Sequence, residues 1–199
     1  MRWFTPLLYP FSVLYDAVTS VRNRLYDTEV KPVAKFWVPV IGVGNLSVGG
    51  TGKSPMIEYL IRLISPELRV ATLSRGYGRK SRGIRIANDK DDAITIGDEP
   101  LQFYRKFVDK AVVAVGEDRA LAIAHILQEH PDREVILLDD AFQHRRVQAS
   151  FQILLTDYNN LFINDYLLPA GTLREARRGA ARRCWGRSRS LTTRSAPMC

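Results

Sequence analysis

The chain has 199 residues, of which 46% are hydrophobic, 25% charged and 10% aromatic, so it is neither a disordered nor a fibrous protein. Its formal net charge is +8, but residues 182–199 hold five arginines and no acid, which leaves only +3 for the remainder and argues against a nucleic-acid-binding footprint. Both cysteines, Cys184 and Cys199, lie in that same segment, which argues against a disulfide framework and favours a reducing cytoplasm.

An amphipathic helix is the first predicted element. Apolar residues recur at helical spacing with polar residues between them, at Phe11, Leu14, Tyr15, Val18 and Val21. Aromatic residues before this run and arginines around it are typical of a helix in a membrane interface, so we expect residues 1–27 to form an interfacial helix. The sequence leaves open the alternative that the apolar face packs on the protein core. No apolar stretch approaches the roughly 18 residues needed to span a bilayer.

Strands and helices then alternate along residues 28–181, which we expect to form one lobe. Helical spacing predicts helices at residues 56–64 and 119–129, and apolar runs predict strands at residues 38–43, 70–73, 111–115, 135–138 and 151–155. Alternation of buried strands with helices implies an α/β fold, with a parallel sheet flanked by helices as in the P-loop NTPases.

A glycine-rich segment follows the first strand of this lobe and opens its first helix. Residues 44–54 read Gly-Asn-Leu-Ser-Val-Gly-Gly-Thr-Gly-Lys-Ser, which is the pattern and setting of a Walker A loop. Glycine-rich backbone amides and a helix N-terminus bind phosphates, a lysine reaches the β- and γ-oxygens, and a serine hydroxyl is a Mg²⁺ ligand. The predicted nucleotide-binding residues are Ser47, Val48, Gly49, Gly50, Thr51, Gly52, Lys53 and Ser54. Ser47 stands where the loop usually has its first glycine, and a flexible glycine-rich turn is the alternative interpretation.

Two carboxylates end another predicted strand. Residues 135–138 are apolar and are followed by Asp139 and Asp140, which resembles a Walker B segment that delivers an acid to Mg²⁺ at the carboxyl edge of a sheet. The guanine-reading order Asn-Lys-x-Asp is not matched, because the nearest run is Asn88-Asp89-Lys90-Asp91. ATP with Mg²⁺ is therefore the predicted cofactor pair, in preference to GTP.

Five motifs in order carry a resemblance to one family. They are Val43-Gly44-Asn45 leading into Gly49–Pro55, then Ser74–Arg79, Gly97–Pro100, Leu138–His144 and Pro169–Glu175. Over residues 1–181 the chain resembles the bacterial tetraacyldisaccharide 4′-kinases of lipid A assembly. The resemblance implies an ATP-dependent enzyme, peripheral on the cytoplasmic face of the inner membrane, that phosphorylates the 4′-hydroxyl of a glycolipid, tetraacyldisaccharide 1-phosphate. Nucleic acid is not expected as a partner, because only Tyr77 supplies an aromatic residue among the cations of residues 75–85, and no protein partner is inferred.

The resemblance also implies roles for single residues. It makes Lys53, Asp98 and Asp139 catalytic, with Asp98 as the base for the acceptor hydroxyl. It places four residues around the metal: Ser54, Asp139, Asp140 and Glu175.

Several of these residues have a competing structural explanation. Asp98 and Glu99 precede Pro100 at a predicted helix start, where N-capping alone accounts for acids. Glu175 lies among arginines, so a surface ion pair explains it equally. His144 follows the two aspartates closely, and its role stays open between catalysis and structure.

A group of cations occupies a short glycine-containing loop: Arg75, Arg79, Lys80, Arg82 and Arg85. Such a group can receive the 1-phosphate of the substrate or anionic lipid headgroups. The candidate substrate contacts are Arg75 and Arg79 of this loop, together with Arg174. A solvated basic loop is the alternative.

Residues 182–199 differ abruptly in composition from the rest of the chain. We expect them to be a disordered basic tail that a frameshift or comparable lesion put in place of the family's second lobe, with little or no kinase activity left. Two other functions compete with the kinase. One is a P-loop ATPase or GTPase of the regulatory or metallochaperone type without a phosphate acceptor, and the other is a nucleic-acid binder that uses the basic tail.

Overall fold

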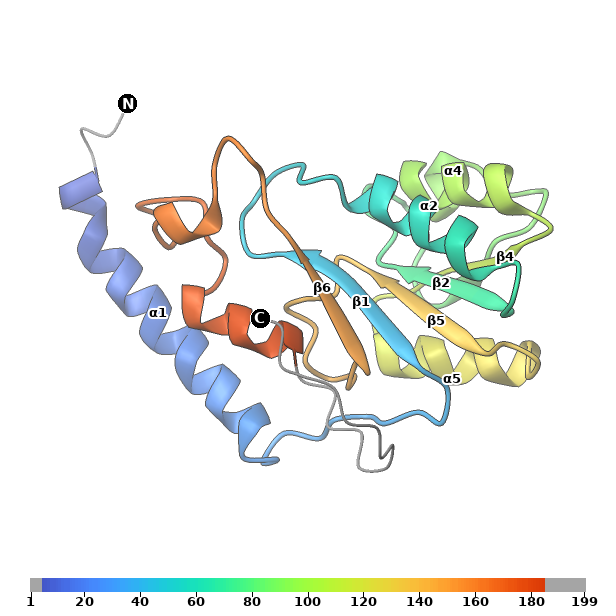
Figure 1. Ribbon diagram of the computed structural model, residues 1–199, viewed down its shortest axis with the longest axis horizontal. Coiled ribbons are helices and arrows are strands. Elements are labelled where there is room, and N and C mark those ends of the chain that lie inside the picture. The colour runs from blue at the N-terminus through green and yellow to red at the C-terminus, as the bar shows by residue number, and fades with distance from the viewer. Residues whose placement is uncertain (1–4, 185–199) are drawn as a thin grey trace, which may run out of the picture.

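A six-stranded sheet forms the centre of the structure, a computed structural model that describes residues 5–184 (Figure 1). The strands, which lie in the order β3-β4-β2-β5-β1-β6, are β1 (Val40–Asn45), β2 (Val70–Ser74), β3 (Arg85–Ile86), β4 (Ala111–Val115), β5 (Val135–Asp139) and β6 (Phe151–Leu155). The helices are α1 (Thr5–Asp27), α2 (Lys53–Ile64), α3 (Ala93–Ile96), α4 (Asp98–Phe107) and α5 (Arg119–Glu129), with 3-10 helices η1 (Phe162–Asn164) and η2 (Arg177–Cys184).

The predicted α/β fold is confirmed, with one strand that departs from the parallel arrangement. β1 pairs with β5 and β6, and β2 pairs with β4 and β5, all in parallel. β3 pairs antiparallel with β4, so the sheet is mixed and not wholly parallel. A two-residue strand carries no period-2 pattern, which is why the sequence did not predict it.

Helices cover both faces of the sheet. On β5, Val135 and Leu137 pack with residues of α2 and α4, whereas Ile136 and Leu138 pack with residues of α5. Successive side chains of a strand point to opposite faces, so both sets are buried at once. This double burial explains why the strand reads as a continuous apolar run in the sequence.

The carboxyl ends of β1 and β5 meet at one edge of the sheet. Val43 lies opposite Asp139 in the parallel register. The glycine-rich loop that follows β1 therefore begins beside the two aspartates that follow the apolar part of β5. Ligands of open α/β sheets bind outside the carboxyl ends of the strands, so this edge is the candidate site.

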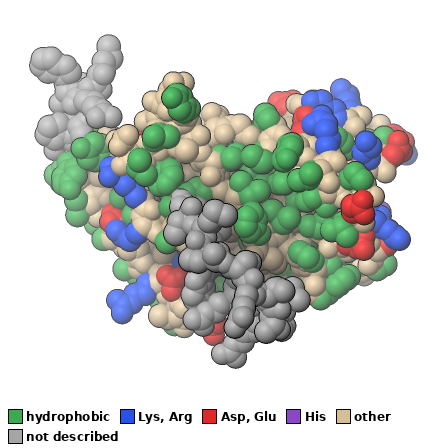
Figure 2. All heavy atoms as spheres, in the orientation of Figure 1, with side chains coloured by type: hydrophobic (Ala, Val, Ile, Leu, Met, Phe, Trp, Pro, Cys, Tyr) green, Lys and Arg blue, Asp and Glu red, His purple; other side chains and the backbone are tan. Residues whose placement is uncertain are grey.

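α1 lies beside the sheet with its apolar side turned away from the protein. Phe11, Leu14, Val18 and Val21 are each between 60% and 65% exposed, whereas Ser12 is only 4% exposed. Hydrophobic side chains gather along this outer edge in Figure 2, where α1 has the same place as in Figure 1. The alternative that this apolar face packs on the core is therefore wrong. No helix in the described part of the chain has the length and apolar character needed to cross a membrane.

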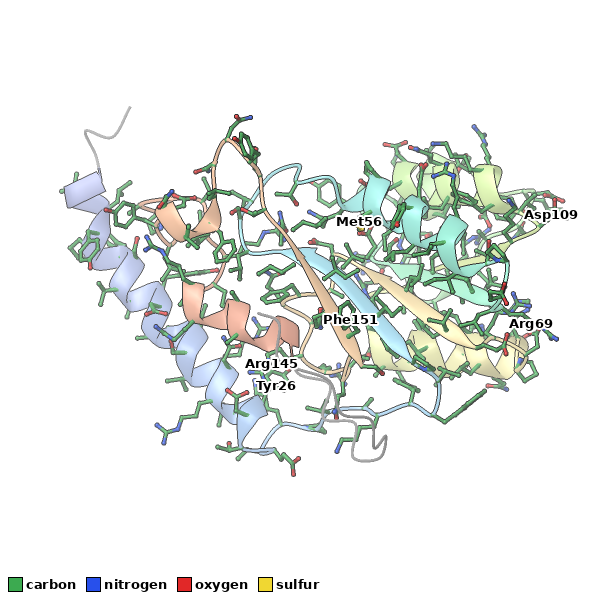
Figure 3. The ribbon with its side chains drawn as sticks, viewed as in Figure 1. Tyr26, Met56, Arg69, Asp109, Arg145 and Phe151 are labelled. Carbon is green, nitrogen blue, oxygen red and sulfur yellow. The ribbon has the colours of Figure 1, made fainter. Side chains whose placement is uncertain are left out.

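Polar contacts fix α1 to the rest of the protein. The Tyr15 hydroxyl donates a hydrogen bond to the carbonyl oxygen of Arg174 at 3.0 Å. At the other end of the helix, the Arg145 guanidinium forms an ion pair with Asp27 at 2.5 Å and lies 5.4 Å from the centre of the Tyr26 ring (Figure 3). These contacts hold the helix in place without burial of its apolar stripe.

The predicted basic tail lies mostly outside the described residues. Residues 182–184 belong to η2, so the irregular segment does not begin at residue 182. Residues 185–199, on which the rest of that prediction falls, are not described.

Candidate functional site

The glycine-rich loop has the strand–loop–helix setting that a Walker A loop requires. It follows β1, and α2 begins at Lys53 with Gly52 as its N-cap. Gly49 and Gly52 have φ angles of 114° and 79°, a region that side chains with a Cβ rarely adopt. These two glycines are therefore required for the turn that brings the chain to the N-terminus of α2, where the helix dipole favours phosphate.

Ser47 occupies the usual glycine position because the chain is extended there. It forms an antiparallel β-bridge with Leu173. On either side of it, the Val48 amide donates to the Thr172 carbonyl oxygen at 2.8 Å, and the Arg174 amide donates to the Leu46 carbonyl oxygen at 2.7 Å. An extended residue with φ below zero does not need glycine, so this departure from the Walker A pattern leaves the turn intact.

Lys53 lies between two acceptors at the sheet edge. Its Nζ is 3.4 Å from Oδ1 of Asn45 and 3.6 Å from Oδ1 of Asp140, and its side chain is 16% exposed. Asp140 in turn lies 3.3 Å from the Arg174 guanidinium. The backbone of Asp140 has a φ angle of 47°, which directs the chain sharply away from β5. A cation held loosely between neutral and charged oxygens remains available to a phosphate.

Asp139 is a buried carboxylate at the end of β5. It is 4% exposed, and its Oδ1 has no hydrogen-bond partner among the described residues. Burial, together with the nearby charges of Glu99 and Asp140 and against the opposing charge of Lys53, raises the pKa of Asp139 to about 6. A buried, unpaired carboxylate oxygen is costly unless it serves a ligand.

Oxygen ligands suitable for Mg²⁺ gather around this carboxylate. The Ser54 hydroxyl donates a hydrogen bond to the carboxylate of Glu99, which also acts electrostatically on Asp139. Hydroxyl and carboxylate oxygens are the protein ligands that Mg²⁺ prefers, with phosphates and water as the rest of its shell. The residues present therefore fit the metal. Sequence reasoning treated Glu99 only as a helix-capping acid, and nothing in its spacing from Ser54 signals the contact.

Glu175 is not brought together with the two aspartates. It is 5% exposed, and its Oε1 accepts a hydrogen bond from the Asn23 side chain of α1 at 2.6 Å. Within residues 5–184 no cluster of three or more acidic, histidine or cysteine side chains can hold a metal ion. The predicted grouping of Asp139, Asp140 and Glu175 is thus not formed in the described part of the chain, where Glu175 is a buried residue bonded to α1.

Asp98 lies in the first turn of α4, directly before Glu99. The N-cap of α4 is Gly97, and no side chain caps the helix, so the capping explanation is wrong for both acids. The Asp98 side chain is exposed, and within the described residues it makes no hydrogen bond or ion pair. A carboxylate without a structural partner, one residue from a side chain that contacts the Walker A serine, is suited to accept a proton.

The three candidate substrate cations have different surroundings. The Arg79 guanidinium donates to the Gly83 carbonyl oxygen at 2.7 Å and to Glu117 at 2.6 Å, and its side chain is 3% exposed. It closes the basic loop and is not free for a phosphate, contrary to the prediction. The Arg174 guanidinium forms an ion pair with Asp140, whereas Arg75 is exposed directly after β2.

A buried arginine that sequence reasoning missed lies near the aspartates. Arg119, the first residue of α5, is 2% exposed, and its Nε and Nη2 have no hydrogen-bond partner among the described residues. Burial lowers the pKa of Arg119 to about 10, so the group keeps its charge at neutral pH. Burial, with Arg119 and Arg75 nearby, also lowers the pKa of His144 to about 4. His144 is therefore neutral near pH 7.

Comparisons with known proteins agree with this geometry. Residues 4–184 match the family model of tetraacyldisaccharide-1-P 4′-kinase. Tetraacyldisaccharide 4′-kinase of Flavobacterium psychrophilum is 55% identical over 92% of this chain and 53% of its own length, and that of Bacteroides thetaiotaomicron is 52% identical over 88% and 46%.

A solved structure shares the fold. The crystal structure of LpxK from Aquifex aeolicus in complex with ATP has a TM-score of 0.81 and 40% identity, over 90% of this chain and 56% of that one. The chain thus spans about half the length of the curated relatives that it matches. The matched family model, the relatives and this structure agree, and the chain belongs to the tetraacyldisaccharide 4′-kinase family.

Proposed function

We propose that this chain binds ATP with Mg²⁺ and serves transfer of the γ-phosphate to the 4′-hydroxyl of tetraacyldisaccharide 1-phosphate. The observation that carries the proposal is the approach of Lys53 to Asp140, 3.6 Å apart, at the sheet edge where β5 ends in Asp139, beside a Walker A loop with its two required glycines. The names of the relatives and the ATP complex of the Aquifex aeolicus structure support it.

Each side chain has a distinct part in this proposal. The loop amides and Lys53 hold the phosphates, and Asp98 accepts the proton of the acceptor hydroxyl. Ser54, Glu99 and Asp139 would hold Mg²⁺, which supplies charge neutralisation at the β- and γ-phosphates when bound. Catalysis is then mainly a matter of position and electrostatics.

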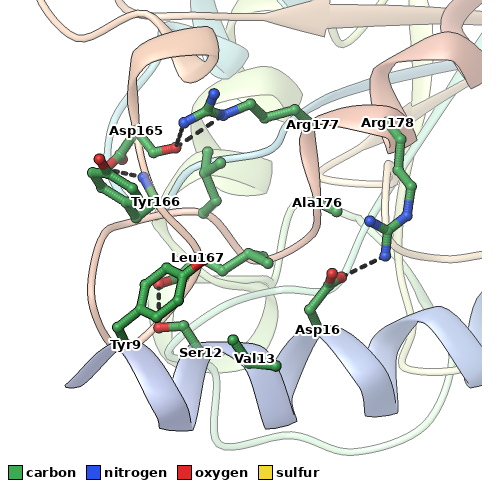
Figure 4. Close-up of a pocket in the computed structure, with 11 residues that line it drawn as sticks. Tyr9, Ser12, Val13, Asp16, Asp165, Tyr166, Leu167, Ala176, Arg177 and Arg178 are labelled. Carbon is green, nitrogen blue, oxygen red and sulfur yellow. Dashed lines mark hydrogen bonds and ion pairs between the residues drawn. The ribbon is translucent and has the colours of Figure 1, made fainter. Parts of the chain in front are cut away.

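A cavity beside α1 supports a glycolipid as the substrate class. It has a volume of about 330 Å³ and lies between α1 and residues 165–178, with Tyr9 and Val13 on one wall and Arg177 and Arg178 on another (Figure 4). The apolar and aromatic part of this wall suits acyl chains. The two guanidinium groups are engaged within the protein, Arg177 with the Asp165 carbonyl oxygen and Arg178 with the Asp16 carboxylate.

The exposed stripe of α1 supports a membrane surface as the partner. Burial of apolar side chains in the interface would offset their exposure in water, by about 25 cal/mol per Å². We propose a peripheral position on the cytoplasmic face of the inner membrane, with α1 in the headgroup region.

Two polar substitutions in the stripe test this position. Leu14→Asn together with Val18→Asn should release the chain from anionic liposomes in a flotation assay, because both side chains are more than 60% exposed and contribute apolar area to the interface. Leu121→Asn on α5, where the side chain is 61% exposed, is the matched control and should not change binding. Equal flotation of both variants would exclude α1 as the membrane contact.

Binding of Mg²⁺ and ATP should weaken as the pH falls through about 6. The proton and the metal compete for Asp139, whose raised pKa of about 6 means that the ionised form is available above that pH and is lost below it. Calorimetry between pH 5 and 8 should show a steep dependence of the ATP–Mg²⁺ affinity on pH in the wild type and a shallower one in Asp139→Asn. Titration of the nucleotide itself affects both proteins equally. Identical slopes would show that Asp139 does not meet the metal.

The direct test of the function is a radiolabelled transfer assay with tetraacyldisaccharide 1-phosphate as the acceptor. Label on the lipid, absent without the acceptor, supports the kinase. Release of inorganic phosphate that is independent of the lipid would support the P-loop ATPase, the competing function.

A further inference from the structure

Residues 165–174, here named the strap, form a compact turn built on one buried carboxylate. Asp165 is 6% exposed, and its side chain accepts hydrogen bonds from the Tyr166 amide at 2.8 Å, the Thr172 amide at 3.1 Å and the Thr172 hydroxyl. The Arg177 guanidinium donates to the Asp165 carbonyl oxygen at 2.7 and 3.1 Å, as Figure 4 shows. Three donors on the carboxylate and two on the carbonyl fix both ends of this residue.

The strap is joined to the start of the glycine-rich loop. The Thr172 carbonyl oxygen accepts from the Val48 amide, and the Arg174 amide donates to the Leu46 carbonyl oxygen. These two bonds flank Ser47, which is the residue that replaces the usual glycine. Thr172 therefore connects Asp165 to the loop. Its amide and hydroxyl donate to the Asp165 carboxylate, and its carbonyl oxygen accepts from the Val48 amide.

α1 supports the strap from its other side. The Ser12 hydroxyl donates to the Leu167 carbonyl oxygen at 3.0 Å and accepts from the Ala170 amide at 3.1 Å. Asp165 and α1 thus both hold the strap, whose residues Thr172 and Arg174 bond the start of the glycine-rich loop.

We propose that Asp165 is a positioning residue for phosphate binding, which acts through Thr172 on the extended start of the loop. A buried carboxylate that is satisfied by N–H and O–H donors alone is costly to desolvate, and a neutral side chain would close a surface turn at lower cost. Charge-assisted bonds are shorter and stronger than neutral ones, so the carboxylate fixes Thr172 more tightly. Loss of that restraint frees the Val48 amide and lets the glycines beyond it sample other turns. The proposal rests on the nucleotide binding proposed above.

Asp165→Asn keeps the shape of the side chain, but its NH₂ group then faces N–H and O–H donors of Tyr166 and Thr172, which need an acceptor. It should weaken binding of ATP with Mg²⁺ by about tenfold, as expected for loss of one or two hydrogen bonds, and should speed amide hydrogen exchange at Val48 in the nucleotide-free chain. Asp157→Asn is the matched control, because that exposed aspartate accepts one local bond, from the Asn159 amide at 2.9 Å. It should change neither quantity.

A second pair of variants separates positioning from folding. Thr172→Val should reproduce the loss of affinity, and Thr172→Ser, which keeps the hydroxyl, should restore it. Equal affinity of these two variants, or unchanged exchange at Val48 in Asp165→Asn, would overturn the proposal even if Asp165→Asn folds poorly. If the wild type binds no ATP while Asp165→Asn still speeds exchange at Val48, the proposed function fails and the positioning of the loop stands.

Discussion

Lys53→Ala is expected to weaken binding of ATP with Mg²⁺ by about 10- to 100-fold, the usual cost of a lost hydrogen bond to a charged group. Among the described residues the Lys53 ammonium makes two long contacts, with Asn45 and Asp140, which leave it available to a phosphate. Asp140 keeps Arg174 as a partner in the variant, so the fold should survive. Calorimetric titration with ATP and Mg²⁺ measures the effect.

Lys110→Ala is the matched control for this change. Lys110 is exposed in the turn that follows α4, and its ammonium makes no ion pair among the described residues. The Lys110→Ala change removes one positive charge, as Lys53→Ala does, but leaves the glycine-rich loop unchanged. If Lys53→Ala and Lys110→Ala bind ATP equally well, the glycine-rich loop is not a nucleotide site.

Asp98→Asn is expected to reduce transfer to the lipid acceptor by about 10²- to 10⁴-fold, which is the usual contribution of a general base. The affinity for ATP should not change, because Asp98 makes no contact with the loop among the described residues. Asparagine is nearly isosteric, and an exposed side chain without partners contributes less than about 0.5 kcal/mol to the free energy of unfolding. The transfer assay, calorimetry and chemical unfolding measure the three quantities separately.

Asp109→Asn, in the turn that follows α4, serves as the control for a lost negative charge. Turnover of Asp98→Asn equal to that of this control would remove Asp98 from the chemistry. Loss of turnover together with loss of ATP affinity would instead assign Asp98 to the nucleotide site.

The nucleotide loop and the sheet were predictable because their signals are local. Gly52, Lys53 and Ser54 are consecutive, and the apolar runs of β1 and β5 depend only on burial of both faces of the sheet. The predicted first strand began two residues early, since Val38 is buried without belonging to β1. Strand ends depend on pairing, which composition does not encode.

The rest of the site depends on contacts between residues far apart in the chain. Glu99 meets Ser54 across 45 positions, and Thr172 meets Val48 across more than a hundred. Arg79 was predicted as a substrate contact, and its ion pair with Glu117 on another loop was not foreseen. Sequence patterns report local periodicity and motif order, so neither the ion pair of Arg79 nor the place of Glu175 against α1 is visible in them.

The outward apolar side of α1 reverses the usual relation between side-chain polarity and sequence variation. Hydrophobic contact is non-directional, so any large apolar residue can replace Phe11 or Leu14 while the stripe persists. Ser12 and Tyr15 instead satisfy hydrogen bonds of defined length and direction, which alanine or valine cannot make. Among homologous chains, the polar positions of this helix should therefore be the invariant ones, and its apolar positions should interchange freely.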